Sequence, residues 1–364
     1  MSQRILIALC ATAAVSYGSL LLGSSLYIAA LRRRLRRHAK LLTVNGQSIN
    51  VSVLGDGEVT VVLDAGLGMS TISWHWIASI VASKARVVMF DRPALGCSPV
   101  SSSASVGLPS SQCYDKGDSA ERVPWLRAVG DIVSLMHDVL DSIDAARGAG
   151  RGRRKLVLVG HSTAGMDVRL YCHRHGDEVK GLVLVDTASE RQLNLLQGTS
   201  VYNTYPDVEE TEAKLTRVRY LWRNGLFLPM YILSGPTFAK LCWYFPPLIS
   251  LLRFFDSLGR AAAVQVRQNV KMLGPHLPKA LLSQFMDEQL SPDGMEAMLA
   301  EHGSQRASMN YMLSLDLLKA GVLGSRPLTG TQFTCCTSTK VQILTPEELR
   351  ARRARRALSV YLRH

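Results

Sequence analysis

The sequence predicts an α/β fold in which a mostly parallel sheet is flanked by helices, with a helical lid insertion and an N-terminal transmembrane helix. Short apolar runs alternate with helical stretches through the first half of the chain, and each run is continuously apolar. Such strands, separated by helices, are typical of a parallel sheet that is covered on both faces. The chain also opens with a long uncharged run, and its middle part breaks the strand–helix alternation.

These features divide the 364 residues into four parts. We expect an N-terminal anchor and basic flank over residues 1–40, and the first part of the core over residues 41–189. Residues 190–310 would form the lid insertion. Residues 311–364 would form the C-terminal part of the core, which we expect to be incomplete. An apolar content of 47% and a charged content of 20% exclude wholesale disorder.

The anchor is predicted from residues 5–31, a run of 27 residues without a charge. At about 1.5 Å per residue, a helix of this length exceeds the roughly 30 Å hydrocarbon core of a bilayer. A signal peptide has a shorter apolar region, of about 7–15 residues; a buried or interfacial helix is the remaining alternative. Arg4 stands alone before the run, whereas residues 32–40 carry six Lys and Arg. The positive-inside tendency therefore predicts a single-pass membrane protein whose large domain faces the cytoplasm.

The elements of the core follow in chain order. Asn45-Gly46 lies between two β-prone runs in residues 41–54, which is typical of a hairpin. Apolar strands are then expected at residues 59–64, 86–91, 155–160 and 181–186, and helices at residues 70–83, 125–144 and 164–175. Residues 99–124, rich in Ser, Gly and Pro, predict a surface loop.

The insertion is expected to be mainly helical. Its residues 219–255 hold ten aromatic and four basic residues and no acid. Four prolines in this stretch argue against one continuous membrane-spanning helix. We interpret it as a lid over an apolar pocket, in contact with the membrane surface; an ordinary apolar packing layer of helices is an equal alternative.

The net charge of +13 is concentrated in three runs without acids, namely residues 32–40, 147–155 and 350–364. No motif that reads DNA or RNA accompanies them, so nucleic acid is not an expected partner. The seven cysteines include no C-x-x-C pair and no Cys/His ligand spacing, so we expect no metal and no disulfide framework. Free thiols fit a domain in the reducing cytosol.

The strongest chemical motif is KLVLVGHSTAG, residues 155–165. An apolar strand runs into Gly160, His161 and Ser162, and a helix follows. Such a turn holds the serine in a strained conformation, requires small neighbours, and presents the hydroxyl beside a helix N-terminus. Ala164 replaces the last glycine of a G-x-S-x-G pattern.

Two further motifs precede this turn in the expected order, VVLDAGLGMS at residues 61–70 and MFDRPALGCS at residues 89–98. With them, the sequence resembles the α/β-hydrolase fold superfamily, in its serine-hydrolase form, over residues 41–190. The resemblance implies that Ser162 is the nucleophile and that the backbone N–H groups of Leu67 and Thr163 form the oxyanion hole. It implies no cofactor.

A serine nucleophile needs a base, and the base needs an acid that orients it. Asp186 ends the strand at residues 181–186 and is the expected acid, since the seventh-strand candidate, residues 326–336, is followed by no acid until Glu347. The alternative role of Asp186 is to cap the turn that follows it.

The resemblance places the catalytic histidine near the C-terminus, where this sequence has only His364. Either His364 is the base or the base is absent. His161 is expected to be structural; the other histidines lie outside any catalytic motif or in the insertion.

Three hypotheses follow. The first is a membrane-anchored serine hydrolase that cleaves an ester, thioester or amide bond of a small apolar or lipid-like substrate through an acyl-enzyme at Ser162. The second is a catalytically silent protein of the same fold that acts as a binding or scaffold module. The third is a truncated or alternatively spliced product of an active enzyme.

Overall fold

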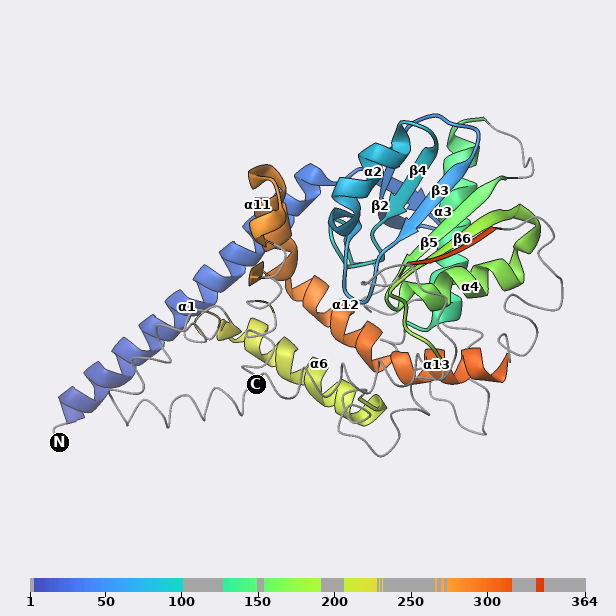
Figure 1. The fold of residues 1–364 in the computed structure, drawn as a ribbon. Helices are drawn as coiled ribbons and strands as arrows, with labels where there is room; N and C mark the ends of the chain where they lie inside the picture. Colours follow the sequence, from blue (N-terminus) through green and yellow to red (C-terminus); the bar gives the residue numbers. More distant parts are fainter. Residues whose placement is uncertain are drawn as a thin grey trace.

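The computed structural model describes residues 3–100, 127–148, 154–190, 206–227, 274–315 and 332–336, together with isolated positions between 229 and 271. The expected fold class is confirmed (Figure 1). The strands are β1 (Leu41–Val44), β2 (Gln47–Leu54), β3 (Thr60–Asp64), β4 (Arg86–Phe90), β5 (Leu156–His161), β6 (Val179–Val185) and β7 (Gln332–Cys336). The helices are α1 (Gln3–His38), α2 (His75–Ala82), α3 (Val129–Ala146), α4 (Ala164–Arg174), α6 (Val208–Arg223), α11 (Lys279–Gln289), α12 (Pro292–Gly303) and α13 (Gln305–Ser314).

The strands form one sheet in the order β1-β2-β4-β3-β5-β6-β7. β2 pairs antiparallel with β1 and β4, and every other pairing is parallel. The predicted hairpin turns at Asn45 and Gly46, both with positive φ, of 47° and 78°. A two-residue turn of this kind matches the twist of the two strands that it joins. The parallel strands end at one edge of the sheet, which is where ligands bind in open α/β folds.

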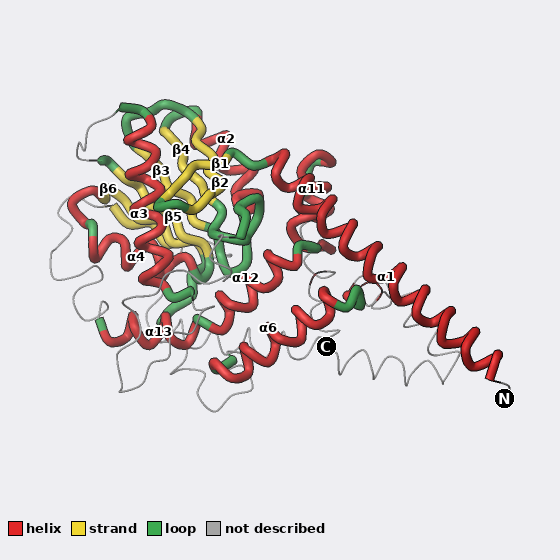
Figure 2. The backbone as a smooth tube through the Cα atoms, turned by 180° about the vertical axis from the view of Figure 1, so that it is seen from behind, coloured by secondary structure: helices red, strands yellow, loops and turns green. Residues whose placement is uncertain are grey.

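Helices cover both faces of the sheet. Side chains alternate between the faces of a strand, so Val62 and Leu158 point to one face while Leu63 and Val159 point to the other. The first set packs with α3 and α4, and the second with α2. Figure 2 shows α3 lying over the sheet on the side opposite to α2. The helix expected at residues 70–83 is divided into a 3-10 turn, Thr71–Trp74, and α2, with Ser70 as the N-cap residue.

The described part of the insertion is helical, as expected. Asp207 is the N-cap residue of α6, and its side chain accepts a hydrogen bond from the Glu210 N–H at 2.8 Å. α12 begins after Ser291, whose hydroxyl accepts the Gly294 N–H at 3.3 Å, and carries proline at its first position. α11, α12 and α13 run in succession along the edge of the sheet where the parallel strands end (Figure 1). Most of residues 219–255, expected as the aromatic part of the lid, lie outside the described residues.

Helix α1 projects from the body, with the N-terminus at its far end (Figure 1). In the part of the chain that the structure describes, it is the one helix long and apolar enough, over Cys10–His38, to cross a membrane. Apolar side chains of its N-terminal two thirds are exposed, among them Val15 at 69% and Leu22 at 62%. By length and composition the helix is compatible with a membrane span or a signal sequence; the orientation of the large domain stays a prediction.

The C-terminal third of α1 packs on the insertion. Leu31 and Leu35 are buried in an apolar cluster with Leu221 and Trp222 of α6. The basic residues after the apolar run belong to the same helix, which continues to His38. Two of its arginines form ion pairs with insertion acids at 2.7 Å: Arg32 with Asp293 at the start of α12, and Arg34 with Asp287 of α11.

Candidate active site at the end of strand β5

The turn at Ser162 joins β5 to α4, and the backbones of the strand and the helix lie very close together there. Ser162 has a φ of +55°, a left-handed conformation that costs a non-glycine residue free energy and that is concentrated at functional sites. A Cβ atom at Gly160 would lie 2.6 Å from the Ala164 carbonyl oxygen, and a Cβ at Gly165 would collide with Thr187. The small residues of the motif are therefore required where the strand, the helix and the segment after β6 meet.

The backbone of Ser162 is held on both sides. Its N–H donates to the Val185 carbonyl at 3.1 Å, and its carbonyl accepts the Ala188 N–H at 2.8 Å. The side chain is half-buried, and its hydroxyl has no hydrogen-bond partner among the described residues. A Cβ at Gly66 would lie 3.1 Å from the Ser162 Cβ, so the segment after β3 passes directly beside this side chain.

Two backbone amides are free beside Ser162. Within the described ranges, the N–H groups of Leu67 and Thr163 have no acceptor, whereas the neighbouring Gly68 N–H donates to Glu301 Oε2 at 2.8 Å. Leu67 follows Gly66, which contacts Ser162, and Thr163 begins the turn into α4. Unpaired N–H groups next to an unpaired hydroxyl are the parts that an oxyanion hole requires.

Asp186 directly follows Val185, the residue that binds the Ser162 amide, and its side chain is exposed. Its φ is +44°. Its charge acts on His161: burial lowers the His161 pKa, while the Asp186 charge acts in the opposite direction. The His161 ring meets Trp74 edge-on, with 6.4 Å between ring centroids, which fits a neutral structural side chain. His364 lies outside the described residues, so the acid and base roles stay predictions.

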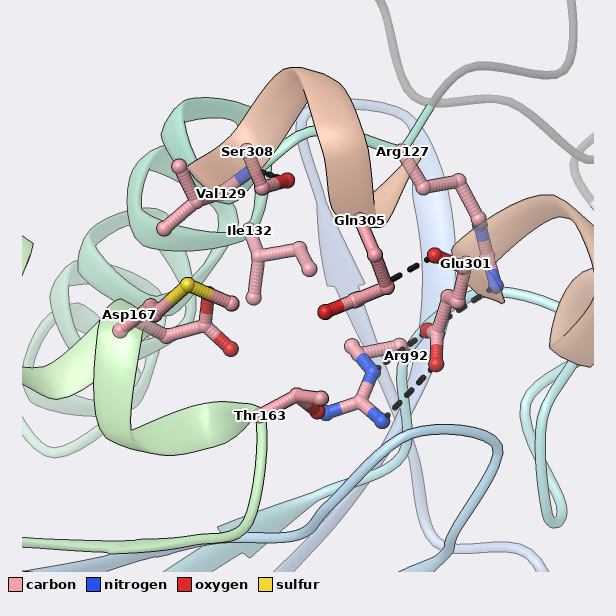
Figure 3. A pocket seen from close by; sticks show the side chains of 10 residues that line it. Arg92, Arg127, Val129, Ile132, Thr163, Asp167, Glu301, Gln305 and Ser308 are labelled. Carbon is pink, nitrogen blue, oxygen red and sulfur yellow. Dashed lines mark hydrogen bonds and ion pairs between the residues drawn. The ribbon is translucent and has the colours of Figure 1, made fainter. Parts of the chain in front are cut away.

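Asp64, Arg92, Arg127, Asp167 and Glu301 form a buried ionic cluster. Figure 3 shows Arg92, Arg127, Asp167 and Glu301 of this cluster. Arg92 Nε donates to Glu301 Oε1 at 2.7 Å, and its Nη1 donates to Asp64 Oδ1 at 3.1 Å. Arg127 Nη1 reaches Glu301 Oε1 at 3.3 Å. Burial raises the pKa of Asp64 to about 6 and raises that of Asp167 well above its usual range.

The charges of this ionic cluster balance if one carboxyl keeps a proton. Three carboxyl groups face two guanidinium groups, and Asp64 and Asp167 are within hydrogen-bond reach of each other. Ionised carboxylates only accept hydrogen bonds, so this contact needs a shared proton. The cluster is then neutral as a whole, which is the condition under which buried charges are tolerated.

The sequence did not point to this cluster. Asp64 and Arg92 lie inside the two motifs before the serine turn, and Asp167 follows the turn on α4, but none of them carries a signal of mutual contact. Glu301 is 209 residues from Arg92. A buried acid in the insertion can be assigned to a partner only once the fold brings α12 to the end of the sheet.

Between Thr163, Met166, Gln305 and Ser308 lies a cavity of about 10 Å³ (Figure 3). It has room for a single water molecule. The apolar pocket expected under the lid involves residues 219–255, most of which lie outside the described residues, so it stays a prediction. The same residues include no group of three side chains suited to a metal ion.

A model of the family described as alpha/beta hydrolase fold matches residues 59–226. No curated protein sequence matches the chain. Among solved structures, the chain is similar to a bacterial membrane phospholipase A (23% identity, 62% of this chain and 71% of that chain covered, TM-score 0.31). It is also similar to a thermophilic esterase from Thermogutta terrifontis (16%, 89% and 98%, TM-score 0.42). A third similar structure is the enol-lactonase from Burkholderia xenovorans LB400 (12%, 89% and 100%, TM-score 0.44).

Proposed function

Because the chain belongs to the α/β-hydrolase fold superfamily, we propose that it is a membrane-anchored serine hydrolase that cleaves an ester, thioester or amide bond of an apolar substrate. The observation that carries the proposal is the Ser162 turn. Ser162 is left-handed and its hydroxyl is unpaired among the described residues. It lies between Thr163 and the segment that carries Leu67, whose N–H groups have no acceptor there, at the sheet edge where this fold binds ligands.

The reaction follows from this geometry. Ser162 Oγ attacks the substrate carbonyl carbon while its proton passes to a base, and the carbonyl oxygen takes up negative charge. The Leu67 and Thr163 N–H groups bind this oxyanion, a contribution that costs about 100-fold to 1,000-fold in rate when one donor is lost. The base then protonates the leaving group, and the acyl-enzyme remains. Water attacks the acyl carbon in the second half and restores the Ser162 hydroxyl.

We assign the acid to Asp186 and the base to His364, as the sequence predicts. Asp186 is supported by its place directly after the residue that binds the Ser162 amide. Without a base, a serine hydrolase keeps only the residual rate that the oxyanion hole and binding supply. His364→Ala with full activity would remove this residue from the mechanism.

The apolar substrate is proposed from the anchor. A helix whose exposed side chains are largely apolar over its first two thirds holds the site close to a bilayer, where apolar and lipid-like molecules concentrate. The basic residues after the apolar run favour a single-pass arrangement with the large domain on the cytoplasmic side.

The test is covalent labelling of the full chain in membranes with a fluorophosphonate probe. We expect labelling of the wild type and none of Ser162→Ala. The matched control is Ser142→Ala on α3, whose hydroxyl only donates to the Asp138 carbonyl at 2.7 Å. A folded wild-type protein that stays unlabelled would refute the enzyme proposal and leave the silent binding module.

A further inference from the structure

We propose that Glu301 on α12 is a positioning residue that holds residues 65–68 in the conformation that presents the Leu67 amide to the oxyanion. This inference rests on the proposed function and names a part of the site that the insertion, rather than the core, supplies.

Glu301 binds the loop both directly and through Arg92. Its Oε2 accepts the Gly68 N–H at 2.8 Å, and its two oxygens accept Arg92 Nε and Nη2 at 2.7 and 3.2 Å. Arg92 in turn donates to the carbonyl oxygens of Ala65, at 2.8 Å, and Gly66, at 2.7 Å. The loop is therefore held on both sides of Leu67, and the Leu67 amide itself is left free.

Packing of α12 against the loop further restricts residues 65–68. Gly68 has a φ of +66°, and a Cβ atom there would lie 2.5 Å from Met298 Cγ on the same helix as Glu301. The loop thus has close contact with one side chain of α12 and a charged hydrogen bond to another. Hydrogen bonds to ionised groups are shorter and about twice as strong as neutral ones, so Glu301 fixes the direction of this amide more firmly than packing alone.

Burial makes the arrangement rigid. The side chains of Arg92 and Glu301 are 4% and 3% exposed, so no solvent competes for their hydrogen bonds. Arg92 uses three of its donor nitrogens on Glu301, Asp64 and two loop carbonyls, a fork geometry that lysine lacks. A pair that served stability alone would not need to bind the backbone of consecutive residues beside the nucleophile.

The variant Glu301→Gln tests the support of residues 65–68 while the charge balance of the buried cluster is preserved. It removes one negative charge from the ionic cluster, and the proton held between Asp64 and Asp167 can then leave, so that the buried charges balance again. The glutamine amide, however, places a donor against the guanidinium or against the Gly68 N–H. The loop loses part of its support while the fold keeps a neutral interior. Glu301→Asp is the second variant: it keeps the charge but is too short to bind Gly68 and Arg92 together.

The experiment compares the full-length wild type, Glu301→Gln, Glu301→Asp and the control Glu296→Gln. Glu296 lies on the same helix and pairs with Arg219 at 2.7 Å, away from the loop. Hydrogen exchange of residues 65–70 is followed by mass spectrometry. Saturation kinetics of fluorophosphonate labelling give the maximal rate constant and the half-saturating concentration separately.

We expect faster exchange of residues 65–70 in both Glu301 variants and not in the control. Because a misplacement of about 1 Å in a reacting group costs about 100-fold, we expect the maximal labelling rate to fall about 10-fold to 100-fold while half-saturation stays within about threefold. Unchanged exchange in the Glu301 variants, or a wild-type maximal rate, overturns the inference. If the wild type itself is not labelled, the proposed function fails, and the exchange result alone decides whether Glu301 holds the loop.

Discussion

Replacing Gly160 by alanine tests the packing that shapes the Ser162 turn. The added Cβ would lie 2.6 Å from the Ala164 carbonyl oxygen and 2.7 Å from Val168 Cγ2, whereas ordinary contact begins at 3.4 Å. Strand β5 and helix α4 must therefore separate by about 0.8 Å, and the nearest atom is backbone, which cannot rotate away. Overpacking of this kind costs about 1–3 kcal/mol, offset in part by about 0.4–1 kcal/mol from the stiffer unfolded chain.

The same displacement moves Ser162 relative to residues 65–68, which pass beside it. A shift approaching 1 Å predicts a loss of about 100-fold in fluorophosphonate labelling rate, larger than the stability change alone would give. The assay measures the labelling rate and the urea midpoint of the full chain in detergent. Gly23→Ala in α1 is the control, because its Cβ would meet nothing within 4 Å. If Gly160→Ala keeps both the wild-type rate and the wild-type midpoint, the close contact of strand and helix is not what shapes the site.

Three further predictions concern the framework. Glu190→Gln leaves the buried Arg169 guanidinium without its partner and should cost about 3–5 kcal/mol in the free energy of unfolding; a loss below about 1 kcal/mol would contradict this. Burial raises the pKa of Glu288 to about 8, so folding favours its protonated form: its contribution to stability is complete below the unfolded pKa of about 4.5 and is lost as the pH rises through 8. Glu288→Gln should flatten the pH dependence of the urea midpoint in this range, and an unchanged profile would exclude Glu288 as its source. Leu31→Ala should cost about 2–5 kcal/mol because Leu31 is fully buried, whereas Leu22→Ala, at a 62% exposed position of the same helix, should leave the unfolding midpoint unchanged.

The sheet could be predicted from the sequence because each parallel strand is apolar throughout. Residues 59–64, 86–91, 155–160 and 181–186 were expected as strands, and the structure places strands within one or two residues of these limits. The serine turn could be located for a similar reason, since glycine and alanine must stand where a strand and a helix touch. Both features are local, and local patterns are visible in sequence.

Contacts between distant segments could not be predicted. Arg32 and Arg34 were expected as a membrane-flanking charge cluster, yet they pair with Asp293 and Asp287, more than 250 residues away. A run of arginines has the same appearance whether it faces lipid headgroups or acidic side chains.

The burial of Leu31 and Leu35 against α6 makes the C-terminal third of α1 part of the folded body. Deletion of the first forty residues would expose the side chains of Leu221, Trp222 and Phe227 to solvent. The resulting apolar patch would favour aggregation. Tyr17 donates to Asn224 Oδ1 at 2.8 Å and Ser24 donates to the Gly225 carbonyl at 3.3 Å, so the helix contacts the insertion from Tyr17 onward. A shortened protein should therefore start before Tyr17, so that the part of the helix that covers the insertion is retained.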